Sequence, residues 1–277
     1  MLGLIVLCAE TGAGLPPHAL LDSLLGVPLL ARGIAAALPT DEAVTGVLVV
    51  PRDLLDRTKS DIVERFGLDE IDRVVAGGPD RRSALLAGLE ALPADVDFVL
   101  IQEGARVLVP AGTPDRVAKA ARSADGAVPA ALLREGVVAD EGGALVSVDV
   151  RPRLRALQGP ACFRVASLKS ALAQVVENPS AEMDRSEAEN TAQAGGSVLL
   201  VPGDDDNLLL RDSADVSRAL EVFSRRAVDY AFLYPRDLLP DDPLAKALDP
   251  GESREEDSTM SGDGTLNTGA PLDTSRS

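Results

Sequence analysis

The chain has few lysines, aromatic residues, histidines and cysteines. Of its 277 residues, four are Lys, one is His, two are Cys and none is Trp, and aromatic residues make up 3%. Two isolated cysteines, Cys8 and Cys162, are too few for a disulfide framework or a zinc site. We therefore expect them to be buried thiols of a reduced protein. With so few aromatic residues, we expect a core built from Ala, Val and Leu.

Positive charge and long apolar runs are also scarce. The formal net charge is −17, whereas nucleic acids and anionic membranes are bound by basic surfaces that release counterions. The composition therefore argues against both as partners. No apolar run reaches the ~18 residues that a membrane-spanning helix needs, and the first residues lack the basic region of a signal peptide. We expect a cytoplasmic protein.

Short apolar runs alternate with segments of helical spacing along most of the chain. The predicted strands are Leu2–Leu7, Gly46–Val50, Arg73–Ala76, Phe98–Gln102, Gly126–Pro129 and Val198–Val201. The predicted helices are Pro28–Leu38, Arg52–Phe66, Arg81–Leu92, Pro114–Ala124, Val165–Glu177, Ala181–Ala194 and Ser213–Val228. Repeated βαβ units with almost continuously apolar strands predict an α/β fold whose mostly parallel sheet is covered on both faces.

Two segments depart from this alternation. Val137–Val138 and Ala144–Val150 flank a turn at Ala139–Gly143, which predicts a β-hairpin arm over about residues 134–150. Such an arm often packs on a partner subunit. The last residues, 239–277, contain nine acidic and three basic side chains and little that could be buried. We predict one domain over residues 1–238, followed by a disordered acidic tail over residues 239–277.

Three loops follow predicted strands at Val74–Arg82, Val99–Pro110 and Leu199–Asn207. Open α/β sheets bind ligands, nucleotides above all, at the carboxyl ends of their strands. None of the three loops contains a lysine. A site that transfers phosphoryl or nucleotidyl groups must neutralise several oxyanions at once. The sequence therefore predicts a nucleotide-site geometry with an unusually small supply of positive charge.

The order of the motifs carries a resemblance to a known family. In sequence they are a glycine turn at Thr11–Gly14, GVPLL at Gly26–Leu30, VVAGG at Val74–Gly78, GARVLVP at Gly104–Pro110, RPRLRALQGPACF at Arg151–Phe163 and VPGDDDN at Val201–Asn207. From about Leu2 to Phe223 the chain resembles the methylerythritol phosphate cytidylyltransferase family. The resemblance implies a Rossmann-like nucleotidyltransferase sheet, CTP as substrate, Mg²⁺ as cofactor, and a homodimer joined by a β-arm. It also implies transfer of CMP to a polyol phosphate, with release of pyrophosphate.

The resemblance also implies roles for single residues. His18 stands in place of a phosphate-binding lysine, Glu103 in place of a metal-binding aspartate, and Arg151 matches an arm arginine that reaches the substrate of the neighbouring subunit. The implied catalytic residues are His18, Arg106 and Arg151; the implied nucleotide-binding residues are Ala9, Gly12, Gly14, Gly77, Gly78 and Arg81; and the implied metal ligands are Glu103 and Asp206.

The chain departs from the family pattern in its charges. A loop arginine and a loop lysine are absent, and Leu209 replaces a third cation, while Asp204, Asp205 and Asp206 add negative charge nearby. We therefore expect reduced activity. Two alternatives remain open: a non-catalytic dimeric binding or regulatory protein on the same fold, and a nucleotidyltransferase with a less anionic substrate. Arginines near the predicted sheet edge could also replace the missing cations, so that no charge is lost. The candidates are Arg81, Arg82, Arg106 and Arg211.

Overall fold

A central β-sheet organises the protein. The computed structural model describes residues 1–8, 15–78, 80–133, 139–142, 144–146, 154–177 and 186–226. The sheet has eight strands in the order β10-β7-β11-β6-β1-β4-β5, with β12 paired to β7. Their bounds are β1 (Leu2–Leu7), β4 (Val44–Val50), β5 (Ile71–Ala76), β6 (Phe98–Glu103), β7 (Gly126–Leu132), β10 (Arg155–Leu157), β11 (Ala161–Arg164) and β12 (Val198–Pro202).

Most strands of the sheet run in the same direction. Parallel pairing joins β6 to β1, β1 to β4, β4 to β5, and β12 to β7. The short strands β10 and β11 pair antiparallel with their neighbours. The prediction of a mostly parallel, Rossmann-like α/β sheet is confirmed. Its carboxyl edge brings together the loops that follow β5, β6 and β12.

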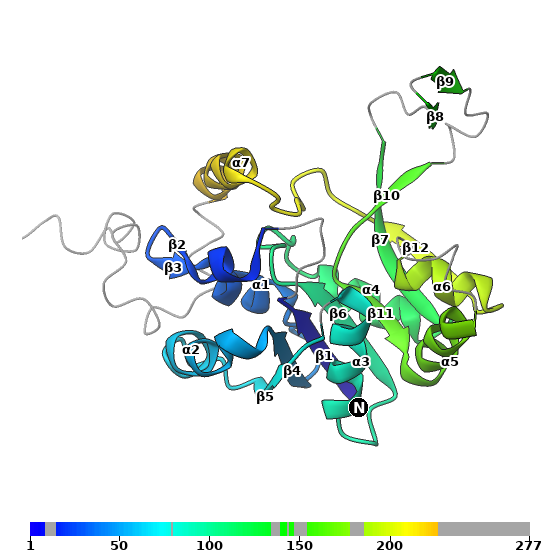
Figure 1. Cartoon of the computed structure of the whole chain (residues 1–277), viewed down its shortest axis with the longest axis horizontal. Coiled ribbons are helices and arrows are strands. Elements are labelled where there is room, and N and C mark those ends of the chain that lie inside the picture. Colours follow the sequence, from blue (N-terminus) through cyan, green and yellow to red (C-terminus); the bar gives the residue numbers. More distant parts are fainter. Residues whose placement is uncertain are drawn as a thin grey trace, which may run out of the picture.

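Helices cover both faces of the sheet (Figure 1). Alternate residues of β1 point to opposite faces, so Leu4 and Val6 join one hydrophobic cluster while Ile5 and Leu7 join the other. The first cluster receives side chains from α1 (Leu29–Ala37), α4 (Thr113–Ala121) and α7 (Ser213–Arg225). The second receives side chains from α3 (Arg81–Ala91), α5 (Val165–Glu177) and α6 (Glu187–Gln193). This layering explains why the parallel strands are apolar at nearly every position.

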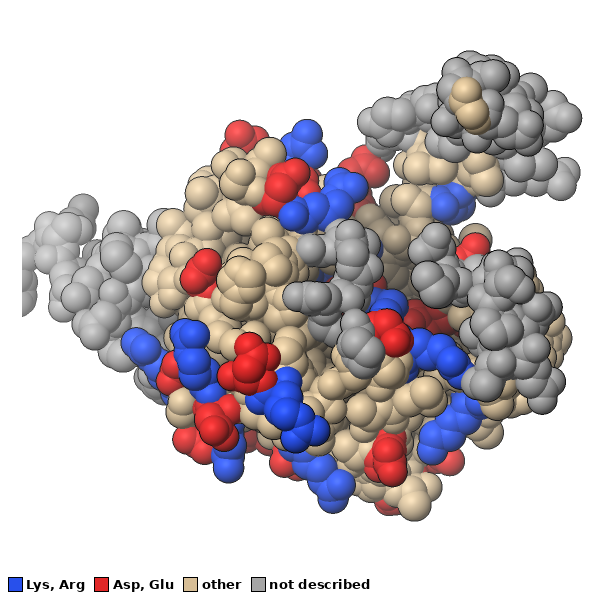
Figure 2. All heavy atoms as spheres, in the orientation of Figure 1, with Lys and Arg blue, Asp and Glu red and all other residues tan. Residues whose placement is uncertain are grey.

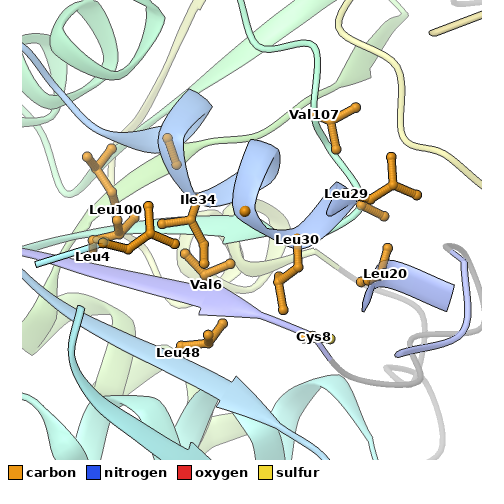
Figure 3. Close-up of a cluster of buried hydrophobic side chains, with 14 of the residues drawn as sticks. Leu4, Val6, Cys8, Leu20, Leu29, Leu30, Ile34, Leu48, Leu100 and Val107 are labelled. Atoms are coloured by element: carbon orange, nitrogen blue, oxygen red, sulfur yellow. The ribbon is translucent and has the colours of Figure 1, made fainter. Parts of the chain in front are cut away.

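Aliphatic side chains fill the core between α1 and the sheet (Figure 3). Leu30 and Ile34 lie one helical turn apart on α1, are fully buried, and belong to the same cluster as Leu4, Leu48 and Leu100. The spacing of four residues places both on the helix face that meets the strands. The core is built largely from Leu, Ile, Val and Ala, as the composition predicts.

Both cysteines are free thiols and both are buried. Burial raises the pKa of Cys8 and of Cys162 to about 12. The expectation of buried thiols is therefore confirmed.

Because a thiolate is the reactive form, the two cysteines should be inert in the folded protein. At pH 8 we expect their reaction with Ellman's reagent to be about 10³-fold slower than in the urea-unfolded chain, where the pKa returns to its ordinary value. Absorbance at 412 nm measures both rates. Rapid modification of two thiols under native conditions would contradict the burial of these side chains.

Some elements differ from the sequence predictions. The predicted helix Arg52–Phe66 is divided into a 3-10 turn, η2 (Arg52–Leu54), a short α-helix, α2 (Leu55–Thr58), and a π-helical turn, η3 (Lys59–Glu64). Strands β10 and β11 were not predicted, because segments of three and four residues are too short to show a period. A 3-10 turn, η1 (Pro17–Leu21), and the two-residue strands β2 (Ser23–Leu24) and β3 (Val27–Pro28) were also missed.

The predicted hairpin is confirmed, but its turn is shorter than predicted. Strands β8 (Ala139–Glu141) and β9 (Ala144–Val146) pair antiparallel, so the residues predicted as the start of the turn form a strand. Gly142, which lies within the predicted turn, follows β8 and has a φ of +61° that suits glycine. Strands β7 and β10 extend out of the sheet, and the hairpin lies beyond them, away from the body (Figure 1). The rest of the arm and residues 239–277 lie outside the described residues, so the disordered tail stays a prediction.

Acidic and basic side chains are interspersed over the face of the molecule shown in Figure 2, without one large area of a single sign among its described residues. Within the described part of the chain, no helix combines the length and the apolar character that crossing a bilayer demands.

Candidate functional site

The loop after β5 turns sharply into α3. The amide of Gly77 donates a hydrogen bond to the carbonyl of Val50 at 2.8 Å. A Cβ atom on Gly77 would lie 2.9 Å from Val49 Cγ1, and one on Gly78 would lie 2.2 Å from Ser83 Oγ. Both positions therefore require glycine for steric reasons alone. Their contact with a nucleotide stays a prediction.

Four charged side chains form a connected row at the carboxyl end of β6. Glu187 accepts from Nε and Nη2 of Arg81 at 2.8 and 3.1 Å. The same Nη2 lies 3.2 Å from Oε1 of Glu103, and Nε of Arg106 lies 2.8 Å from Oε2 of Glu103. Helix α6, helix α3 and strand β6 are thus joined by alternating charges. Three predicted site residues, Arg81, Glu103 and Arg106, are brought together here.

The row is charged but balanced. Burial alone would raise the pKa of Glu103, but Arg106 and Arg81 outweigh it and hold the pKa of this carboxyl below its usual range. Burial alone would lower the pKa of Arg81, but Glu187 and Glu103 together raise it. Glu103 and Arg81 are therefore ionised at neutral pH. The row contains two guanidinium groups and two carboxylates, so its formal charges cancel. A triphosphate would meet a site that is polar and ionised, yet neutral.

Arg106 also anchors the loop that follows β12. Its Nη1 donates to the carbonyl of Asn207 at 2.9 Å, and its own carbonyl accepts from Nε2 of Gln102 at 2.8 Å. Gln158 holds the same loop through both main-chain groups of Asp204, at 2.7 and 3.0 Å. Because this guanidinium is almost completely buried, Arg106 links β6 to the third predicted loop from the inside.

The acidic run in this loop, which we expected to add negative charge near the phosphates, is neutralised in part by two arginines at the end of α7. Arg225 lies 2.8 Å from Asp206, and Arg226 lies 3.5 Å from Asp206 and 3.6 Å from Asp204. Residues distant in sequence supply these cations, so a count of charges within the loop did not reveal them. Asp206, the second predicted metal ligand, is directed at the end of α7.

The neighbourhood of Glu103 suits a hard cation. A Cβ atom on Gly159 would lie 2.7 Å from Oε2 of Glu103 and 3.0 Å from Oε1 of Gln102, so both oxygens face the same small space. Gln102 is fully buried, and within the described residues its Oε1 has no hydrogen-bond partner. Mg²⁺ prefers such oxygens and usually combines one or two carboxylates with substrate phosphates. Among the described residues, no group of three or more His, Cys, Asp or Glu side chains could hold a metal ion.

The remaining predicted site residues lie elsewhere or outside the described residues. His18 is exposed on η1. Ala9, Gly12, Gly14 and Arg151 lie outside the described residues, so their roles stay predictions. Of the lysines, Lys59, Lys119 and Lys169 lie on helical segments and not in the strand-end loops. Glu187 and Gln102 were not predicted as site residues, because neither has a sequence motif of its own.

The family model described as 2-C-methyl-D-erythritol 4-phosphate cytidylyltransferase matches residues 9–225. The chain belongs to this family. The match confirms the resemblance, and its extent agrees with the region over which the motifs were recognised.

Relatives and solved structures agree with this assignment. The 2-C-methyl-D-erythritol 4-phosphate cytidylyltransferase of Streptomyces avermitilis is 32% identical over 240 residues, covering 82% of this chain and 94% of that protein. The enzyme of the same name from Streptomyces coelicolor is 31% identical, and the match covers 82% of this chain and 87% of that protein. Two solved family structures share the fold. The structure from Anaerococcus prevotii has a TM-score of 0.67 and 18% sequence identity, and the match covers 81% of this chain and 96% of that chain. The structure from Thermus thermophilus has a TM-score of 0.61 and 24% sequence identity, and the match covers 80% of this chain and 98% of that chain.

The described charges at the carboxyl end of β6 are carried by arginine and glutamate side chains. Glu103 and Arg106 contact each other directly, and the match of Glu103 to a metal-binding aspartate of the family stays a prediction. Leu209, which we expect to stand in place of a family lysine, packs against the hydrophobic core.

Proposed function

We propose that the protein transfers CMP from CTP to 2-C-methyl-D-erythritol 4-phosphate and releases pyrophosphate. The observation that carries this proposal is membership of the cytidylyltransferase family across residues 9–225. It is supported by the contacts among Arg81, Glu103 and Arg106 at the carboxyl end of the sheet, where such folds bind nucleotides.

The reaction exchanges one phosphoanhydride for another. A phosphate oxygen of the acceptor attacks the α-phosphorus of CTP and forms a new P–O bond, while the bond from that phosphorus to the bridging oxygen breaks and pyrophosphate leaves. The attacking oxygen is already anionic, so the step needs no general base. The protein must align the two phosphates and offset their charge. Arg81 and Arg106 are the described cations best placed for this work.

Mg²⁺ is the cofactor that this charge balance calls for. Glu103 would hold it, with Oε1 of Gln102 in the same small space. Bound there, the ion would neutralise phosphate charge that the balanced row of side chains leaves uncompensated. Glu103 is ionised at neutral pH and needs no deprotonation before it binds a cation.

The reaction is tested by pyrophosphate release from purified protein supplied with CTP, 2-C-methyl-D-erythritol 4-phosphate and Mg²⁺. We expect turnover that requires all three and that falls when ATP, GTP or UTP replaces CTP. Reduced activity remains a prediction that rests on the missing lysines, and the same assay measures it. CTP binding without turnover would instead support the non-catalytic alternative, and turnover only with another acceptor would support a different substrate.

We also propose a homodimer built on the arm side of the sheet. Among the described residues, strand β12 pairs only with β7, and it exposes Leu199 and Leu200. Leu132 and Leu133 are exposed where β7 leads into the arm. An edge strand next to exposed apolar side chains is suited to association with a second chain.

Because the reaction consumes CTP, we propose that it takes place in the cytoplasm.

The double substitution Leu132→Asp with Leu200→Asp should convert a dimer to a monomer at micromolar concentration. Both leucines are 59% exposed, so the isolated chain should keep its stability within about 0.5 kcal/mol. Analytical ultracentrifugation measures the mass, with Leu86→Asp as a matched control on the exposed face of α3. A wild-type chain that sediments as a 28.8 kDa monomer at all concentrations would refute the dimer.

A further inference from the structure

Glu187 is a buried carboxylate whose place in the molecule is not explained by secondary structure. It lies in the first turn of α6 and is only 8% exposed. The start of this helix is already capped by Ser186 and Glu189, which form a reciprocal capping box. Glu187 takes no part in that box. Its two carboxylate oxygens are instead both directed at Arg81.

A pair of this kind contributes little net stability. Removing a carboxylate and a guanidinium from water costs several kcal/mol per group, and well-packed apolar side chains usually stabilise such a position equally well. The second core cluster, to which α6 contributes Ala188, offers apolar neighbours for such packing. The pair therefore calls for a reason other than stability.

The geometry of the contact fixes the orientation of Arg81. The Nε and Nη2 atoms are both engaged by Glu187, which is the bidentate arrangement that holds a guanidinium plane most firmly. Within the described residues, Nη1 has no hydrogen-bond acceptor, and the Arg81 side chain is partly exposed. One edge of the group is thus held by α6, while the other is available to a ligand.

The carboxylate of Glu103 contacts both Arg81 and Arg106. It also faces the small space near Gly159 that suits a cation. If Glu103 turns toward a cation that arrives with a nucleotide, Arg81 loses that contact. The bidentate contact with Glu187 does not depend on Glu103. It can therefore keep Arg81 in place during the exchange.

We propose that Glu187 is a positioning residue that holds Arg81 for the triphosphate of the nucleotide. The proposal rests on the proposed function, because it takes CTP as the ligand. It assigns α6 a role in nucleotide binding that is transmitted through one side chain.

Calorimetric titration of CTP with Mg²⁺ tests this role. Glu187→Gln should weaken CTP binding about tenfold, within the range lost when a carboxylate that orients a ligand-binding side chain is removed. Glu189→Gln is the matched control: it is the same substitution two residues along the same helix, and glutamine preserves the capping box. That variant should bind CTP like the wild type.

A double-mutant cycle separates positioning from a general structural effect. In an Arg81→Met background, Glu187→Gln should weaken CTP binding no further, because the group it positions is gone. Additive losses would overturn the proposal. So would equal binding by the wild type and Glu187→Gln. If Glu187→Gln fails to fold, Glu187→Asp replaces it, with the same cycle and the same criteria.

The two proposals fail in different ways. If the wild-type protein does not bind CTP, the proposed function fails and this inference fails with it. If the wild type binds CTP and the Glu187 variants bind it equally well, only the role of Glu187 is wrong.

Discussion

Replacement of Arg106 by methionine is expected to lower kcat/KM for CMP transfer by at least ~10²-fold, the loss typical of removing one preorganised charge-stabilising group. It should also lower the free energy of unfolding by about 3 kcal/mol, because it leaves Glu103 short of a partner in a mostly buried setting. The side chain joins Glu103 to the carbonyl of Asn207, so the strand-end carboxylate and the loop after β12 lose their common anchor.

Steady-state kinetics and urea denaturation measure the two effects of the Arg106 substitution. Arg57→Met is the control, because Arg57 forms only an exposed pair with Asp61 and such pairs contribute 0 to about 1 kcal/mol. A stable Arg106→Met protein with unchanged kcat/KM would show that Arg106 is neither an anchor nor a phosphate contact.

Replacement of Glu103 by glutamine is expected to abolish most of the effect of Mg²⁺. The amide keeps the shape but loses the charge that a hard cation prefers. We expect kcat/KM at saturating Mg²⁺ to fall about 10²-fold. The gain in melting temperature that Mg²⁺ adds to CTP should largely disappear, since a ligand stabilises a protein only in proportion to its affinity for the folded state.

The control for Glu103 is Asp206→Asn. Asp206 is the other predicted metal ligand, but its carboxylate contacts Arg225 and Arg226. If Glu103 is the main ligand, the Mg²⁺-dependent shift survives Asp206→Asn and is lost in Glu103→Gln. An unchanged shift in Glu103→Gln would remove Glu103 from the metal site.

The sheet could be predicted from the sequence because its strands are buried on both faces. Leu2–Leu7 and Val47–Val50 are apolar at consecutive positions, a pattern that parallel strands between two helical layers require. The arm was predicted from its glycines. Strands β10 and β11 were missed because each is only three or four residues long, too short to show a period, and each pairs antiparallel with strands from elsewhere in the sequence.

The residues of the site were predicted in part from the sequence, but the ion pairs between them were not. The motifs pointed to Arg81, Glu103 and Arg106, which do lie together. Glu187 reaches them from a position 106 residues away from Arg81, and no pattern within a short window reveals a contact of that range. The acidic run at Asp204–Asp206 shows the same limit. In the sequence it only adds negative charge, whereas in the structure Arg225 and Arg226 at the end of α7 contact Asp206. Counting charges along the sequence thus underestimates how far a fold can balance them.

Phosphorus NMR of the purified protein with CTP, 2-C-methyl-D-erythritol 4-phosphate and Mg²⁺ follows every phosphate of the proposed reaction in one sample. We predict that the CTP and monophosphate signals decline together, while a paired diphosphate-diester signal and free pyrophosphate rise in equal amounts, and that Arg106→Met removes this change. If CTP binds to the folded protein in the presence of Mg²⁺ but all the starting signals persist, the spectrum contradicts a working cytidylyltransferase site.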